Sequence, residues 1–409
     1  MQNKVLDSYF LVLFALIPVS IIVGPSISLI NIVLVDFSFL FLLLYKKDYK
    51  FLSNGSVKLI LLLCLYLVFN SIIAKDFSIS VARNFGFVRF FILFCAFNYF
   101  FCHKNFLNKI LIFWAIIFTI LVLDTYIESI FGKNILGYSA PNNGKRIVSF
   151  FKDEAIVGNY INAFYLIIIG YFFSLGKNFS QKYKNIILIL SVFFFIAIFV
   201  TGERSNAMKA FLGLLIFYYL NDYFTFKQKI FSTLLFFVMM GFIINGSDFL
   251  KMRYGKKQII ESNFIQESVY FNLYNSGLNV FKSNPILGVG NKNYRVEACE
   301  RRNIDKDYSY LCNTHPHQIY LEFLSEHGLI GTLILLFIFF KLIFSNIRVI
   351  LMTKNYVQIG CLTYLITSFT PFIPSGAFFS DFSLTLFWLN ISLMYAVNKK
   401  TNIFGTVAQ

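Results

Sequence analysis

Long apolar runs recur along most of the sequence and constrain its fold more than any other feature. Runs such as 26–45 and 110–131 carry almost no charge. Because the hydrocarbon core of a bilayer is about 30 Å thick, a helix needs roughly 20 apolar residues to cross it. We therefore predict an all-α, polytopic membrane protein with about twelve transmembrane helices. The predicted spans are 8–24, 26–45, 58–74, 84–102, 110–131, 156–175, 186–202, 205–224, 230–246, 328–346, 355–374 and 379–397.

The composition also indicates lipid as the main solvent. Of all residues, 57% are hydrophobic and 14% are charged, whereas globular domains carry about 25% charged residues. This excludes an ordinary soluble enzyme and a disordered chain. The net charge of +16 would indicate nucleic acid only if the basic residues clustered on a soluble face. Most of them lie in short segments between spans, so we expect membrane lipid and no nucleic acid as a partner.

The distribution of Lys and Arg predicts the orientation. Basic residues are concentrated in alternate connecting segments, which places both termini on the cytoplasmic side. The first run is followed directly by Pro25 and by no small-residue cleavage site, so we expect a retained helix and not a signal peptide. Three parts follow: helices over 1–246, a large outer loop with the helix that returns to the membrane over 247–327, and helices with a cytoplasmic tail over 328–409.

Charged residues gather near the outer ends of several spans. Arg83 and Arg89 lie at the outer end of the fourth span, and Glu203 and Arg204 form the short turn between the seventh and eighth. Arginines at this level can clamp a phosphate or diphosphate through paired hydrogen bonds. The alternative is that they anchor the helices among lipid headgroups.

Histidines mark the point where the large loop returns to the membrane. His315 and His317 flank a proline, and Glu322 follows on an amphipathic stretch. A neutral imidazole can take a proton from a hydroxyl nucleophile near pH 7. A structural role is the alternative for these histidines. A zinc ion held by both histidines and a carboxylate is a weaker alternative, because the usual metal-ligand spacings are absent.

Two other patterns in the large loop have structural interpretations. The Gly-x-Gly sequence at 288–290 lacks the strand and helix of a nucleotide-binding unit, so a tight turn lying on the helices is expected. Cys299 and Cys312 flank a polar stretch on the oxidising side, where a disulfide is favoured. Within the spans, Asp36, Asp124 and Glu128 indicate either paired or water-lined interior positions or the proton path of a transporter.

Several motifs, taken in order, resemble the O-antigen ligase and O-antigen polymerase family of bacterial envelope glycan transferases. They are Phe150–Gly158 (FFKDEAIVG), Gly202–Ser205 (GERS), Asn284–Arg295 (NPILGVGNKNYR), Thr314–Glu322 (THPHQIYLE) and Glu326–Gly331 (EHGLIG). The resemblance implies a fold akin to the C-type membrane glycosyltransferases, with a large periplasmic loop, in the bacterial inner membrane. It also implies a donor glycan on undecaprenyl diphosphate and a hydroxyl acceptor on lipid A–core or on another lipid-linked repeat. No metal and no cofactor are needed in this scheme.

The resemblance assigns roles to individual residues. His317 matches the residue that activates the acceptor hydroxyl, and Arg204 matches the residue that holds the diphosphate. His315 and Glu322 fall within the same motif. Many members carry an Arg or His early in the large loop, where this chain has 268–271, so Arg253 and Arg295 are the candidates for the second phosphate ligand. Ligase and polymerase share these motifs, and a transporter or flippase of lipid-linked glycans is the rival interpretation.

Overall fold

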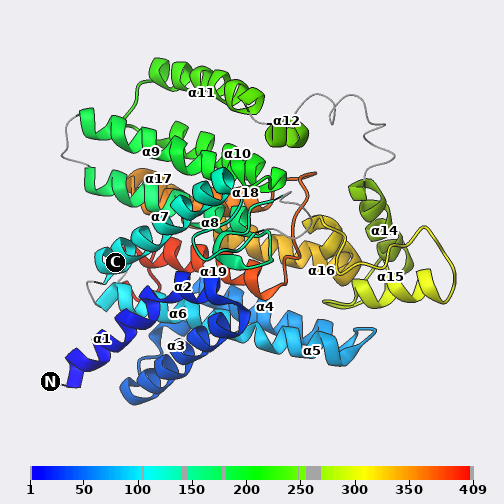
Figure 1. Ribbon diagram of the computed structural model, residues 1–409. Helices are drawn as coiled ribbons and strands as arrows, with labels where there is room; N and C mark the ends of the chain where they lie inside the picture. The colour runs from blue at the N-terminus through cyan, green and yellow to red at the C-terminus, as the bar shows by residue number, and fades with distance from the viewer. Residues whose placement is uncertain are drawn as a thin grey trace.

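The computed structural model (Figure 1) describes residues 2–103, 106–139, 146–176, 181–246, 248–254 and 269–405. These residues form helices joined by turns, with no β-strand among them. The all-α prediction is therefore confirmed for the described chain. The helices are α1 (Gln2–Ala15), α2 (Ile17–Val23), α3 (Pro25–Lys46), α4 (Gly55–Ile72), α5 (Phe77–Gly86), α6 (Val88–His103), α7 (Leu107–Phe131), α8 (Val157–Leu175), α9 (Gln181–Val200), α10 (Arg204–Leu220), α11 (Phe226–Gly246), α12 (Asp248–Tyr254), α14 (Val269–Ser283), α15 (Tyr294–Asn303), α16 (Ile319–Phe344), α17 (Ile347–Thr353), α18 (Tyr356–Ser368) and α19 (Asp381–Ala396).

Each predicted span contains a helix, but not every helix is long enough to cross a bilayer by itself. Within the described residues, 8 helices are long and apolar enough, and the pair α1–α2, bent by 44°, would make a ninth. The remaining three predicted spans correspond to α10, α18 and α19, with 17, 13 and 16 residues. A polytopic membrane protein is thus supported, with some spans shorter than their apolar runs.

Helix α8 is the most deeply buried of the candidate spans and packs closely on α18. A Cβ atom on Gly170 would lie 2.2 Å from the carbonyl oxygen of Tyr356, and one on Gly360 would lie 2.3 Å from that of Leu166. Small residues at such crossings let two backbones approach in a membrane. This packing fixes α8, whose N-terminal end carries part of the site.

Helix α16 is broken at Gly328, where φ is 64° and ψ is −171°. The turn over residues 285–290 pairs with the break. Leu329 and Ile330 donate their N–H groups to the carbonyls of Pro285 and Ile286, at 2.8 and 3.2 Å, and Val289 donates to Ser325 at 3.0 Å. Backbone groups freed at a break must find new partners inside the protein. The Gly-x-Gly sequence therefore supplies the backbone partners of a broken helix, in the tight turn expected from the sequence.

Helices α14 and α15 form a small unit that projects from the helical body beside the end of α16 (Figure 1). The unit has its own core of Val280, Val289, Tyr294 and Ala298. Buried Glu297 pairs with Lys75, from the turn before α5, and with Arg301. Burial raises the pKa of Glu297, but the two cations outweigh it and lower the pKa overall. The unit is thereby attached to the helical body.

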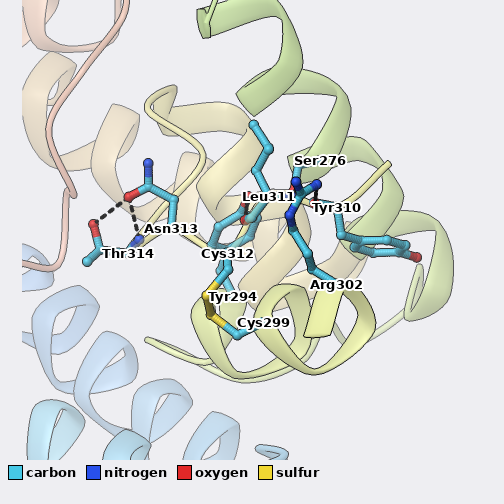
Figure 2. The surroundings of a disulfide bond; sticks show 9 residues. All are labelled: Ser276, Tyr294, Cys299, Arg302, Tyr310, Leu311, Cys312, Asn313 and Thr314. Atoms are coloured by element: carbon cyan, nitrogen blue, oxygen red, sulfur yellow. Dashed lines mark hydrogen bonds between the residues drawn. A yellow bond between two sulfur atoms is a disulfide. The ribbon is translucent and has the colours of Figure 1, made fainter. Parts of the chain in front are cut away.

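A disulfide links Cys299 of α15 to Cys312, as Figure 2 shows. Beside it, the N–H of Leu311 donates to the hydroxyl of Ser276 at 2.9 Å. Arg302 donates to the carbonyl of Tyr310 at 3.1 Å. These contacts hold the segment that leads directly into the histidine motif.

Candidate functional site

The two histidines lie against each other at the start of α16. Their ring centroids are 4.0 Å apart. His315 is buried, and its Nδ1 atom lies 2.9 Å from the hydroxyl of Thr314. Burial, with the nearby His317 and Lys292, lowers the pKa of His315 to about 3. His315 is therefore neutral at pH 7 and suited to hydrogen bonding.

His317 is the more accessible of the pair, and its backbone is fixed. It has a φ of 57°, a left-handed conformation that is uncommon outside glycine. Its carbonyl accepts a hydrogen bond from the N–H of Ser375 at 2.8 Å. Partial burial and the charge of Arg146 lower the pKa of the imidazole. At neutral pH the ring is therefore unprotonated, the state that a general base requires.

Glu322 lies one turn into α16 and is fully buried. Its two carboxylate oxygens accept hydrogen bonds from the N–H groups of Phe378 and Phe379, at 2.9 and 3.3 Å. The side chain thus fastens the connection between α18 and α19 to α16. In this structure Glu322 holds backbone beside the histidines.

Glu203 occupies the short turn before α10 and is also buried. One carboxylate oxygen accepts from the N–H of Gly158 at 2.6 Å, and the other accepts from the side-chain amide of Asn206 at 2.6 Å. Burial raises the pKa of Glu203 to about 7, against the lowering effect of these donors and of Arg146. Its carboxylate ties the start of α8 to the turn, and Arg204 follows it as the first residue of α10, half-buried.

Arg146 connects this turn with the histidines. It is exposed, and its charge acts on both Glu203 and His317. The next residue, Ile147, donates its N–H to the carbonyl of Thr201 at 3.3 Å, which brings the segment to the turn. Arg146 was not singled out from the sequence, because one Lys-Arg pair in a polar connection carries no pattern of its own.

Two buried carboxylates of α7 hold the segment that carries Arg146. Glu128 accepts from the N–H groups of Val148 and Ser149. Asp124 accepts from the N–H of Ile135 at 2.9 Å and from the hydroxyl of Ser149. The sequence left open whether Asp124 and Glu128 are paired interior residues or part of a proton path. The structure shows both carboxylates paired with this segment.

Lys292 is a second cation beside the histidines that the sequence did not single out. It follows the segment paired with the break in α16 and has a φ of 65°. Its charge contributes to the lowered pKa of His315. Backbone pairing at the helix break therefore places a lysine next to the histidine motif.

The remaining predicted phosphate ligands lie elsewhere or are not described. Arg89 pairs with Asp381, at the start of α19, and Arg83 pairs with the same carboxylate. A cavity of about 230 Å³ adjoins Arg89 and Asp381. Arg295 is exposed on α15. The side chain of Arg253 lies outside the described residues, as does Ser268.

The site therefore holds a neutral, partly accessible imidazole with cationic side chains around it. This combination can accept a proton from a hydroxyl and stabilise an anionic leaving group. In the described part of the chain, no three His, Cys, Asp or Glu side chains converge as metal ligands would.

Comparison with known families gives one match. Residues 189–336, from α9 into α16, match the family model described as O-antigen ligase. The matched range includes Glu203, Arg204 and both histidines of the motif, whereas Arg146 precedes it. No curated protein matches the chain. The match confirms the family resemblance predicted from the sequence and supports a membrane glycosyltransferase of the O-antigen ligase or polymerase type.

Proposed function

We propose that this chain, whose residues 189–336 match the O-antigen ligase family, is an enzyme that transfers a glycan from undecaprenyl diphosphate to a sugar hydroxyl. The acceptor is lipid A–core or another lipid-linked repeat unit. The reaction takes place on the periplasmic face of the bacterial inner membrane, with both termini in the cytoplasm. The Lys and Arg distribution supports this orientation. In Figure 1, α17 and the start of α1 lie toward one end of the bundle, and α5, α14 and α15 toward the other.

One observation carries the proposal: the range that matches the O-antigen ligase family contains both the turn with Glu203 and Arg204 and the packed pair His315 and His317, whose rings are 4.0 Å apart. The charge of Arg146 acts on both parts, since it contributes to the pKa shifts of Glu203 and His317. Lys292 adds a cation beside His315. A base and a group of cations on one face are what substitution at an anomeric carbon with a diphosphate leaving group requires.

In the proposed reaction, His317 takes the proton of the acceptor hydroxyl as its oxygen bonds to the anomeric carbon of the donor sugar. The bond from that carbon to the phosphate oxygen breaks, and its electron pair leaves with the lipid diphosphate. Arg204, Arg146 and Lys292 offset the negative charge of the leaving group. The proton on the imidazole then passes to the diphosphate or to solvent, which restores the base.

In this proposal, most of the other predicted residues hold the helices and connections of the site in place. Glu203 fixes the start of α8 against the turn, and Glu322 fixes the α18–α19 connection against α16. Arg89 holds Asp381 at the start of α19. Arg253 and Arg295 remain the candidates for a further phosphate contact from the large loop.

A transporter of lipid-linked glycans is the second candidate, and one observation favours it. Asp36 is buried in α3, and neither carboxylate oxygen has a hydrogen-bond partner among the described residues. Intramembrane charges of this kind occur in transport pathways. Product analysis with purified protein in detergent separates the two, because a transporter has no gradient there and forms no new glycosidic bond.

A further inference from the structure

The surroundings of His317 include aromatic residues in addition to the cations discussed above. The ring of Tyr270 on α14 lies edge-on to the imidazole of His317, with centroids 6.1 Å apart. Tyr274 lies one turn further along α14, and its ring centroid is 6.5 Å from that of Tyr270. The hydroxyl of Tyr274 donates a hydrogen bond to the backbone carbonyl of Phe372 at 3.5 Å. We call Tyr270, Tyr274 and Phe372 the aromatic cluster, which Phe372 joins through this backbone contact. It combines α14 with the α18–α19 connection at the candidate base.

The segment that carries Phe372 is fastened on both sides. The hydroxyl of Tyr320 donates to the carbonyl of Phe369 at 2.6 Å. The N–H of Ser375 donates to the carbonyl of His317, and Glu322 accepts from Phe378. The position of Phe372 is therefore fixed relative to His317.

Phe372 has an exposed side chain and a strained backbone. Its side chain is 86% exposed, although it is a large apolar group. Its φ is 64°, a left-handed conformation that costs energy for a bulky residue and that glycine would adopt freely. Strain of this kind persists where the surroundings enforce it and is concentrated at binding sites.

Two buried polar atoms next to the cluster lack partners among the described residues. They are the Nε2 atom of His315 and the hydroxyl of Ser375. His315 packs on His317, and the backbone of Ser375 bonds to it. Buried polar groups almost always have a hydrogen-bond partner, so this unpaired set points to ordered water beside the histidines.

We propose that the aromatic cluster is a sugar-binding subsite that stacks against a pyranose ring of the acceptor glycan and presents its hydroxyl to His317. A pyranose has faces of polarised C–H groups, which complement the negative face of an aromatic ring. The inference deepens the proposed function and rests on it.

The acceptor fits this subsite better than the donor diphosphate does. A general base must lie within hydrogen-bond reach of the hydroxyl that it deprotonates, so the acceptor sugar has to lie at His317. The three side chains of the cluster are uncharged. Burial raises the pKa of Tyr274 to about 12, which keeps its phenol neutral. Neutral rings offer a diphosphate no charge, whereas they suit a sugar ring.

The test measures sugar binding directly, by saturation-transfer NMR on the full-length protein in lipid nanodiscs. The probes are methyl β-glucopyranoside, methyl β-galactopyranoside and methyl N-acetyl-β-glucosaminide. We expect saturation to reach the ring protons of at least one probe. Phe372→Ala and Tyr270→Ala should each weaken that signal several-fold. Phe85→Ala should leave it unchanged, because Phe85 is an aromatic residue on α5 with a comparable exposure of 71%.

Further variants keep the outcome interpretable. Phe372→Gly removes the ring and also relieves the backbone strain, so it should fold at least as well as the wild type and still show the weakened signal. Phe372→Trp should retain it. His317→Gln should bind the sugar probe and lack transfer activity, which separates failure of this proposal from failure of the proposed function.

Kinetics provide an independent readout. In a transfer assay Phe372→Ala should raise the KM for the acceptor roughly three- to tenfold, the range expected for loss of one stacking contact, with the donor KM unchanged. Absence of any sugar signal from the wild type would overturn the proposal. So would an unchanged signal from Phe372→Ala, the result expected if Phe372 contacts the bilayer instead.

Discussion

The guanidinium of Arg146 lies close enough to the imidazole of His317 to lower the pKa of that ring. The two residues belong to separate connections, one before α8 and one before α16. Glu128, on α7, fixes the first connection by accepting backbone N–H groups beside Arg146. The position of this charge relative to the base is therefore a property of the fold, and it can be tested by changing either residue.

Arg146→Ala should reduce glycan transfer and also change its dependence on pH. A positive charge disfavours the imidazolium, so its removal should raise the pKa of His317 toward the ordinary value of 6.5. A base works only when deprotonated. The acidic limb of the rate profile should therefore move to higher pH in Arg146→Ala, and less so in Arg146→Lys.

Lys133→Ala is the matched control for this prediction. Lys133 is an exposed cation in the same connection, close to the end of α7. The variant removes one positive charge without touching the pair, so its rate profile should overlay that of the wild type. An unshifted acidic limb in Arg146→Ala would contradict the assigned relationship.

Glu203 should make stability depend on pH. Burial raises its pKa from 4.5 to about 7 in the folded protein. Between these values the folded state keeps a proton that the unfolded state has lost. The free energy of unfolding should therefore fall as pH rises from about 5 to 7, by at most about 1.4 kcal/mol per pH unit.

Glu203→Gln isolates this contribution, since glutamine does not titrate. Thermal unfolding in detergent should show a melting temperature that declines with pH more steeply in the wild type than in the variant. The same slope in both proteins would show that Glu203 has an ordinary pKa. Glu203→Ala should destabilise at every pH, because it leaves the N–H of Gly158 without its acceptor.

Gly288→Ala and Gly328→Ala should both destabilise the break in α16. Each glycine has a positive φ, and a Cβ atom at either would lie about 2.5 Å from backbone atoms of the facing segment. The left-handed conformation alone costs roughly 1–2 kcal/mol for alanine, and the overlap adds to this.

Gly55→Ala serves as the reference for these two variants. Gly55 begins α4, and a Cβ atom there would meet nothing within 4 Å. Its melting temperature should equal or slightly exceed that of the wild type, because alanine favours a helix. If Gly288→Ala behaved like Gly55→Ala, the pairing of 285–290 with α16 would be wrong.

The helical framework was largely predictable from the sequence, because the length of an apolar run and the bilayer thickness together define a span. The ends of the helices were less predictable. The apolar run 355–374 predicted a longer helix than α18, which ends at Ser368. The residues beyond it turn back to meet Tyr320 and His317, and these contacts depend on tertiary packing that periodicity does not record.

The residues of the candidate site that belong to a sequence motif were predictable. Those that only tertiary contacts bring to the site were not. His315, His317 and Glu203 were singled out as charged or titratable residues near a membrane edge. Arg146 and Lys292 were missed, because each reaches the histidines only through backbone pairing of a distant segment. Arg89 was expected among the phosphate ligands, but its partner Asp381 is far away in the sequence, and local patterns cannot reveal such a pair.

The most direct test of the central claim is glycan transfer by the purified protein, supplied with a defined undecaprenyl-diphosphate oligosaccharide and a lipid-linked or lipid A–core acceptor. The wild type should form product with a new glycosidic bond. His317→Ala should lower the rate by roughly 10²–10⁴-fold, as expected for loss of a general base, with its melting temperature unchanged. Near-normal product formation by His317→Ala, or none by a folded wild type with either acceptor, would contradict the account.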